Sequence, residues 1–392
     1  MCQSRAAPRR PALADVFDAV PHLDGLSGPQ LQAVAAIQRC RTAALGGHVW
    51  ACDQCGHRAP LYNSCRNRHC PSCQALDAVR WAEARRADLL PVPYFHVVFT
   101  VPPALHGLFR ANPRRAYGLL FTAVAATLKK IARNPKRLGA QIGLTAVLHT
   151  WTQRLAFHPH VHCVVTGGGL SPDGQRWIAS RPKFFLPVKI LSEVFRGKLL
   201  KAFERGLACG ELRRPACTPA DALRQAARPD WVVYAKPPFA RPDDVVAYFA
   251  RYTHRIAISN DRLVALKDGR VTFRWRDRAD GGAPKRCTME AVDFARQFLQ
   301  HVLPQGFVRI RHYGLLANPV RRANLARCRA LLGAPAPPAP PTTPESWIEL
   351  VLRLTGRDVT QCSRCRAGHM AITETLPAAA RAPPPLAGEV AA

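Results

Sequence analysis

The stretch Phe157-His158-Pro159-His160-Val161-His162-Cys163-Val164-Val165 begins with polar residues and ends in a β-branched apolar run. This pattern predicts a strand that enters a sheet. Residues two apart in a strand point to the same face, so His160 and His162 lie side by side with Val161 behind them. Neutral imidazoles on one face suit a divalent cation, which needs a third ligand from elsewhere. An isolated pair also fits histidines without a metal, so the rest of the chain must decide.

The charge of the chain indicates its partner. The 392 residues include 56 Lys and Arg against 26 Asp and Glu, a net charge of +30. A positive field of this size attracts a polyanion, and nucleic acid is the expected one. No membrane is expected as a partner, because the longest uncharged run, 89–109, contains four prolines. Without a signal-peptide pattern the protein is expected in the cytoplasm, where its 14 cysteines stay reduced, so paired cysteines predict metal binding.

Two C-x-x-C pairs near the N-terminus predict a zinc site. Cys52 and Cys55 are separated by 14 residues from Cys70 and Cys73, a spacing typical of a zinc ribbon. Four thiolates around Zn²⁺ can fold a segment too small to bury its own core. Other residues are surplus to one tetrahedral site and could replace a ligand or build a second site: Cys65, His69 and His57. Arg66 and Arg68, between these ligands, either face DNA phosphates or belong to an ordinary solvated loop.

A second cysteine pair follows an Ala/Pro-rich linker at 331–345. Cys362 and Cys365, with His369 nearby, form half of a second potential zinc site whose partners the sequence does not reveal. The last roughly 20 residues are rich in Pro and Ala, a composition that predicts disorder.

Two tyrosines occupy one face of a predicted helix. Pro242 and the two aspartates after it mark a helix start, and Tyr248 and Tyr252 are four residues apart, hence one turn from each other. Such a stripe is often half-buried core. Beside a metal-binding strand, however, a phenol is a competent nucleophile toward phosphorus, and two of them permit two successive transesterifications. Arg251 and Arg255 flank the pair and are candidate phosphate contacts.

Taken together, these motifs resemble the IS91-type rolling-circle insertion-sequence transposases, two-tyrosine members of the HUH (His-hydrophobic-His) endonucleases. The resemblance rests on five segments that span most of the chain in the expected order. They are SCRNRHCPSCQ (64–74), FHPHVHCVVTGGGLS (157–171), WVVYAKPPF (231–239), YFARYTHRIAISNDRL (248–263) and IRHYGLLANPVRRANLA (310–326).

The resemblance implies an α+β fold, with a central antiparallel sheet flanked by helices and a small zinc-ribbon-like module in front of it. The implied domains are a helical and zinc-binding DNA-binding module at 1–90, a catalytic domain at 91–330, the linker, and a tail at 346–392 with its C-x-x-C knuckle. It implies Mg²⁺- or Mn²⁺-assisted cleavage of single-stranded DNA to a 5′-phosphotyrosine, beside structural Zn²⁺. His160 and His162 match the metal-binding pair, and Tyr248 and Tyr252 match the nucleophiles. The third ligand stays open, with His158, Gln153 and His254 as candidates in that order.

Partners and alternatives follow from these assignments. The expected partner is DNA, mainly single-stranded element ends, with strands separated by host replication or a helicase, and no nucleotide cofactor is expected because a Walker motif is missing. Five basic residues are candidate DNA contacts: Arg66, Arg68, Lys236, Arg251 and Arg255. A plasmid replication initiator or relaxase would share the chemistry, and a non-enzymatic zinc-dependent DNA-binding protein would use the histidines and tyrosines structurally. A metallo-hydrolase is disfavoured, because Cys163 follows His162 and no Asp or Glu is near.

Overall fold

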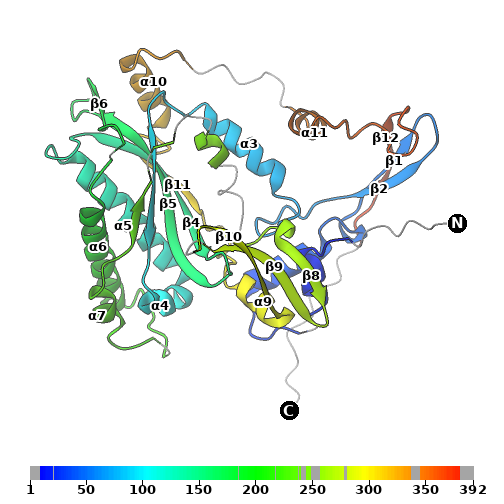
Figure 1. Ribbon diagram of the computed structural model, residues 1–392, viewed down its shortest axis with the longest axis horizontal. Helices are drawn as coiled ribbons and strands as arrows, with labels where there is room; N and C mark the ends of the chain where they lie inside the picture. The colour runs from blue at the N-terminus through cyan, green and yellow to red at the C-terminus, as the bar shows by residue number, and fades with distance from the viewer. Residues whose placement is uncertain are drawn as a thin grey trace.

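The computed structural model describes most of the chain (Figure 1). The described residues are 9–20, 22–183, 185–216, 218–236, 238–239, 244–248, 257–277, 280–336 and 345–379. Within them, no helix is long and apolar enough to cross a membrane.

A six-stranded sheet forms the centre of the larger lobe, and all of its pairings are antiparallel. Its path runs β11-β4-β5-β3-β7, and β6 pairs with β5. The strands are β3 (Tyr94–Thr100), β4 (Gln141–Trp151), β5 (Phe157–Leu170), β6 (Trp177–Ala179), β7 (Val233–Ala235) and β11 (Ile310–Gly314). The predicted α+β class with a central antiparallel sheet is confirmed.

Helices cover the sheet on both sides. One face packs against α5 (Pro113–Arg133) and α6 (Val188–Ala208) and forms the main hydrophobic core (Figure 1). On β5 this buried face includes Val161, Cys163 and Val165, as the two-residue period of the sequence predicts. The opposite face carries His160 and His162 and is covered in part by α3 (Ala75–Arg86) and the helical residues 244–248.

Further helices lie around the central sheet and along the chain that leads to the C-terminal strand. They are α4 (His106–Ala111), α7 (Ala222–Ala227), α10 (Arg321–Leu331) and α11 (Trp347–Thr355), with short 3₁₀ turns at Ala43–Leu45, Pro103–Leu105 and Asn260–Arg262.

A second hydrophobic core joins segments that the sequence assigns to different domains. It packs α1 (Leu13–Asp18) and α2 (Gly28–Arg39) against α9 (Ala291–Leu299) and a three-stranded sheet. That sheet consists of β8 (Leu263–Lys267), β9 (Arg270–Asp277) and β10 (Ala283–Glu290). Phe17 contacts Phe298 edge-on at a centroid distance of 5.9 Å. The predicted boundary at residue 90 therefore does not separate the hydrophobic cores, because part of the 91–330 segment folds onto the N-terminal helices.

The turn between β8 and β9 is a two-residue hairpin loop, Asp268-Gly269. Asp268 and Gly269 both have positive φ, 49° and 71°. Two central residues of this kind match the right-handed twist of paired strands, which is why Asp-Gly is favoured in two-residue hairpin loops.

The third sheet brings the two ends of the described chain together. Its order is β12-β1-β2, with β1 (Gly47–Cys52), β2 (Arg58–Tyr62) and β12 (Met370–Leu376). In Figure 1 the red β12 lies beside the blue β1 and β2. Part of the tail predicted to be disordered is therefore a paired strand, and residues 380–392 lie outside the described residues.

Gly314, at the end of β11, is a position at which a substitution tests how closely β11 packs on β4. Its φ is +65°, and a Cβ there would collide with the carbonyl oxygen of Ile142 on β4. We expect Gly314→Ala to lower the free energy of unfolding by more than about 1 kcal/mol, because both strain and a backbone clash oppose it. In contrast, Gly118→Ala within α5 meets open space and should raise stability by up to about 1 kcal/mol. Urea denaturation measures both, and equal midpoints for the two variants would contradict this account of the sheet.

Candidate active site and metal centres

Three histidines gather on the face of the central sheet away from the main core. His160 and His162 come from β5, and His149 comes from the neighbouring β4, where it is paired directly with His160. One potential ligand atom from each of the three lies within 4.8 Å of the others. The register of β4 against β5 thus supplies a third imidazole to the pair predicted from the sequence.

The hydrogen bonding of this histidine cluster, His149, His160 and His162, suits a metal ion. The Nδ1 of His160 lies 2.7 Å from the carbonyl oxygen of His158, so Nδ1–H donates and Nε2 is the nitrogen left with a lone pair. A ring N–H bound to a backbone carbonyl is the usual support of a metal-binding histidine. His149 and His162 are buried and His160 is partly buried, so the cluster offers imidazole nitrogens in a largely dry site. These donors fit a divalent cation with open positions for substrate.

Tyr248 points its hydroxyl at the edge of the histidine cluster. The Oη atom lies 2.9 Å from Nδ1 of His162 and 2.8 Å from Nε2 of His96 on β3. The two imidazole nitrogens are themselves 2.9 Å apart, and their rings are nearly parallel. The helical segment 244–248 is anchored by Val245 and Val246, which are buried in a small core with residues of α3, β3 and β5. Packing on the sheet therefore fixes the phenol next to the histidines.

The other predicted residues of this site have different positions. His158 is not a member of the histidine cluster, although its ring lies 5.2 Å from that of His160. Burial lowers its pKa. The backbone carbonyl oxygen of Gln153 accepts a hydrogen bond from the Arg262 guanidinium. Four further candidates, Arg251, Tyr252, His254 and Arg255, lie outside the described residues.

Sequence reasoning missed His149 and His96. Each is a single histidine in a strand that is otherwise mostly apolar, 144–151 and 95–101. Their alignment with β5 depends on strand register, which is set by residues far apart in the chain. A lone histidine in a buried strand was the only available signal.

A buried histidine near the end of β4, His301, makes the stability of the fold depend on pH. His301 donates from Nε2 to the Leu155 carbonyl oxygen at 2.9 Å and accepts from the Thr150 hydroxyl at Nδ1, 3.1 Å away. Burial lowers its pKa to about 4, although the Leu155 carbonyl acts in the opposite direction. The unfolded chain binds a proton below pH 6.5 and the folded chain does not until about pH 4, so stability falls as the pH drops through this window.

We therefore expect His301→Gln, which can keep both hydrogen bonds without titrating, to lose less stability between pH 6.5 and 4. The slope of the free energy of unfolding against pH should differ between the wild type and the variant by at most about 1.4 kcal/mol per pH unit. Urea midpoints measured at each pH and normalised to pH 7 test it. Parallel curves for the two proteins would contradict a neutral His301.

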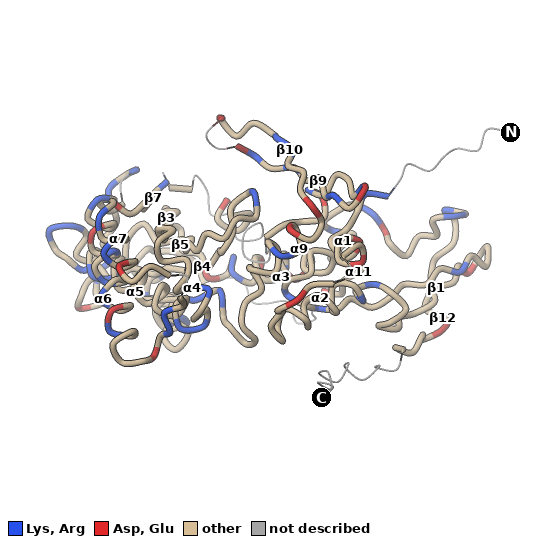
Figure 2. Tube along the Cα trace, turned by 90° about the horizontal axis from the view of Figure 1, so that it is seen from below, with Lys and Arg blue, Asp and Glu red and all other residues tan. Residues whose placement is uncertain are grey.

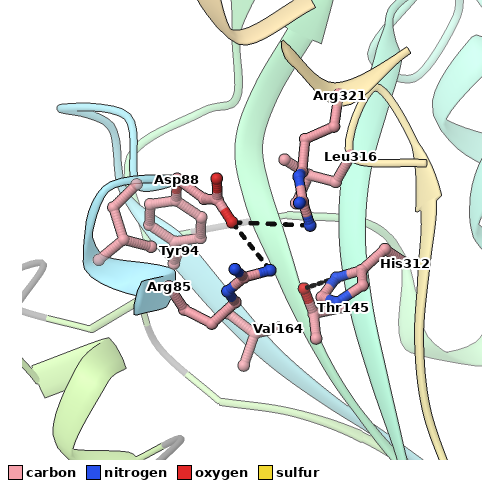
Figure 3. Close-up of a pocket in the computed structure, with 9 residues that line it drawn as sticks. Arg85, Asp88, Tyr94, Thr145, Val164, His312, Leu316 and Arg321 are labelled. Carbon is pink, nitrogen blue, oxygen red and sulfur yellow. Dashed lines mark hydrogen bonds and ion pairs between the residues drawn. The ribbon is translucent and has the colours of Figure 1, made fainter. Parts of the chain in front are cut away.

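Beyond the histidine cluster, the same face of the sheet holds a small pocket lined by both apolar and charged side chains (Figure 3). Asp88 lies between Arg85 and Arg321, with N–O distances of 3.2 and 3.7 Å. The Thr145 hydroxyl is 3.0 Å from Nδ1 of His312, whose pKa is lowered to about 4 by burial and by the two arginines. The cavity measures about 20 Å³, room for one water and none for a nucleotide. The ion pairs of Asp88 at its edge connect α3 to α10.

The predicted zinc quartet is not assembled, which corrects the sequence interpretation. Cys70 and Cys73 join Cys65 and also Cys40, at the end of α2, in a cluster with all ligand atoms within 4.8 Å. Cys52 and Cys55 lie in a separate cluster with the C-terminal pair. The reason is local geometry. β1 and β2 form a hairpin, and Cys52 and Cys55 lie at its turn, apart from residues 65–73. Cys40 was missed because it stands outside any C-x-x-C spacing.

His69 is not a ligand of either cysteine cluster. Its Nδ1 is hydrogen-bonded to Asn67 Oδ1 at 3.0 Å. Its Nε2 accepts a hydrogen bond from the backbone N–H of Leu303 at 3.1 Å. Burial and the charges of Arg68 and Arg309 lower its pKa to about 3. A neutral, fully hydrogen-bonded His69 thus connects the zinc-binding segment to Leu303, a residue of the main core. His57 and His369 are likewise absent from both clusters among the described residues.

The basic residues divide into structural and exposed groups. Arg68 donates to the carbonyl oxygens of Phe307 and Pro304 at 2.6 and 3.4 Å, so its guanidinium makes contacts within the protein. Arg66 and Lys236 are exposed. Lys and Arg are spread over both lobes (Figure 2), which agrees with a long polyanion as partner.

Comparison with known proteins identifies two family matches. Residues 143–324 match the family described as "Putative transposase", and residues 13–101 match "Transposase zinc-binding domain". The chain is 50% identical over 378 residues to the putative transposase y4qJ of Sinorhizobium fredii (strain NBRC 101917 / NGR234), covering 93% of this chain and 95% of that protein. It is 29% identical over 310 residues to the transposase for insertion sequence element IS801 of Pseudomonas savastanoi pv. phaseolicola, covering 76% and 72%.

Among solved structures, the chain shares 15% identity with a conjugative relaxase TrwC in complex with oriT DNA, covering 62% of this chain and 71% of that one, with a TM-score of 0.22. A metal-bound structure of that relaxase with oriT DNA gives 14% identity, coverage of 79% and 98%, and a TM-score of 0.24. Scores this low support no conclusion about this chain.

Proposed function

This chain belongs to the IS91-type insertion-sequence transposases, and on that premise we propose that it cuts and rejoins single-stranded DNA through a 5′-phosphotyrosine formed on Tyr248. The observation that carries the proposal is the position of the Tyr248 hydroxyl, 2.9 Å from a ring nitrogen of His162 in the histidine cluster. Any phosphodiester bound to these imidazoles through a cation would lie within reach of the phenol.

In the proposed step one bond to phosphorus forms and one breaks. The Oη atom of Tyr248 forms a bond to phosphorus, and the bond from phosphorus to O3′ breaks. The electron pair stays on O3′, which takes a proton and leaves as a free 3′-hydroxyl. The phenol gives up its proton, and the acceptor is Nε2 of His96, 2.8 Å away. His162 does not take this proton, because a neutral imidazole that binds a cation has no second lone-pair nitrogen. Because a phosphodiester bond is exchanged for a phosphotyrosine, the later joining step needs no nucleotide cofactor.

The histidine cluster would hold Mg²⁺ or Mn²⁺. When bound there, the cation supplies Lewis-acid polarisation of a phosphoryl oxygen. The protein's own contribution is positioning, since β4 and β5 hold the three imidazoles and the packing of Val245 and Val246 holds the phenol. Tyr252, four residues further on, is proposed as the second nucleophile.

We propose the zinc-binding segment and the exposed basic residues as the DNA-holding part of the protein. Arg66 and Lys236 are candidate phosphate contacts, and Arg251 and Arg255 remain candidates from the sequence. The net charge of +30 supports sequence-independent affinity for single strands that falls steeply with salt. Strand separation is assigned to host replication or to a helicase.

A suicide-substrate assay tests the proposal. Full-length protein is mixed with labelled single-stranded DNA from the flanks of its own gene and with Mg²⁺ or Mn²⁺, then separated on a denaturing gel. We expect a labelled protein–DNA band that disappears with EDTA. Tight DNA binding without such a band, when a related active element run in parallel gives one, would contradict the proposed chemistry and favour a DNA-binding role.

A further inference from the structure

Four cysteines from opposite ends of the described chain meet beside the β12-β1-β2 sheet. Cys52 is the last residue of β1, Cys55 lies in the turn after it, and Cys362 and Cys365 precede β12. The Sγ atoms of Cys52 and Cys365 are 3.7 Å apart, and those of Cys55 and Cys362 are 3.8 Å apart. Tetrahedral zinc with Zn–S bonds of about 2.3 Å separates its sulfurs by about 3.8 Å. A disulfide requires about 2.05 Å, so these distances are those of a metal cage and not of a cystine.

The two cysteine pairs have the same local geometry. Each C-x-x-C is followed by a residue with positive φ, Gly56 at 65° and Arg366 at 58°. In each, the N–H of that residue donates to the carbonyl oxygen of the first cysteine, at 3.2 and 3.0 Å. A backbone N–H also points at one sulfur of each pair, from Gln54 to Cys52 and from Gly368 to Cys365, both at 3.4 Å. Such N–H donors stabilise thiolates, the form that binds zinc.

Contacts between the knuckles fix their arrangement. Asp53 on one knuckle accepts from the backbone N–H of His369 on the other at 2.8 Å. Gly368 packs so closely that a Cβ there would lie 2.5 Å from Asp53 Oδ1 and 2.6 Å from Cys52 Sγ. The junction between the two cysteine pairs therefore favours glycine at position 368.

The sheet next to this cluster has little apolar burial to hold it together. No side chain of β2 or β12 is buried in the structure as described, and the Arg58–Glu374 ion pair on it is exposed and therefore weak. A three-stranded sheet without a buried face needs another source of stability, and a structural metal is the usual one in small modules.

We propose that Cys52, Cys55, Cys362 and Cys365 bind one structural zinc ion, separate from the site at Cys40, Cys65, Cys70 and Cys73. The tail beyond the Ala/Pro linker is then the second half of the N-terminal zinc module, although the zinc-binding family match ends at residue 101. Zinc would thus join residues more than 300 positions apart, as the separation of Cys55 from Cys362 shows.

Metal analysis of the full-length protein tests the stoichiometry. The protein is stripped and reloaded with Co²⁺, whose thiolate charge-transfer absorbance reports cysteine sites and is not produced by imidazoles. We expect two thiolate-bound Co²⁺ ions in the wild type and one in Cys362→Ser/Cys365→Ser. The matched control is Cys209→Ser, an exposed cysteine outside both clusters, which should keep two. An unchanged value of two in the double variant would overturn the proposal.

A second experiment tests whether zinc connects the two ends. A protease site is inserted into the 337–344 segment and cut after folding. We expect the tail fragment to co-elute with the rest of the protein on gel filtration, and to separate from it with a strong chelator or with Gly368→Ala. A tail that stays bound in the chelator, or one that separates before any metal is removed, would contradict the shared site.

Discussion

Replacing Tyr248 by phenylalanine is expected to abolish the first covalent protein–DNA adduct and to lower single-strand nicking by roughly 10³-fold or more. The change removes one oxygen, the atom hydrogen-bonded to His96 and His162, and leaves the ring that packs beside Phe239. DNA affinity should therefore stay within a factor of about two of the wild type. Denaturing gels with labelled single-stranded DNA measure the adduct, and fluorescence anisotropy measures binding.

Tyr62→Phe on β2, remote from the sheet that carries the histidines, is the matched control and should nick normally. Mass spectrometry of the trapped peptide identifies the attached tyrosine. A full-strength adduct in Tyr248→Phe, carried by Tyr252, would show that the first nucleophile is not the residue that contacts the histidine cluster.

His149→Ala is expected to weaken Mn²⁺ binding by more than roughly 100-fold, since loss of a direct ligand exceeds the 10–100-fold typical of outer-shell changes. Nicking should fall with it and recover in part at high Mn²⁺. His158→Ala is the discriminating comparison. It removes the imidazole that the sequence favours as third ligand and keeps the backbone carbonyl that accepts from His160.

Metal affinity, measured by calorimetry, should be unchanged in His158→Ala. If instead His158→Ala loses the metal and His149→Ala keeps it, the cation is held in a different way from the one proposed. Folding is checked by circular dichroism, because His149 is buried and its replacement leaves a small cavity.

Local features of the sequence predicted local features of the fold. The two-residue period of β5 places Val161 and Cys163 in the core and His160 and His162 on the other face. Asp268-Gly269 likewise specifies its hairpin, because both conformations it needs are encoded within the turn. These inferences succeed because strand alternation and turn chemistry depend on neighbouring residues.

Features that depend on distant segments were not predictable in the same way. The pairing of His149 with His160 requires the register of β4 against β5. The approach of His96 to Tyr248 spans 152 residues. The division of the cysteines into two clusters depends on where β12 pairs. A C-x-x-C spacing indicates metal binding but does not say which pairs share an ion.

The pairing of β12 with β1 also bears on how the protein is made. β1 can pair with β2 as soon as residue 62 has left the ribosome, whereas its other edge must await residues 370–376. Cys55 and Cys362 are 307 positions apart, which corresponds to roughly 15 to 60 s of translation at 5–20 residues per second. During that interval the nascent chain carries an open strand edge, a site where unfinished chains on one messenger can pair with each other. The β12-β1-β2 sheet can therefore be completed only after more than 300 further residues have been added to β1.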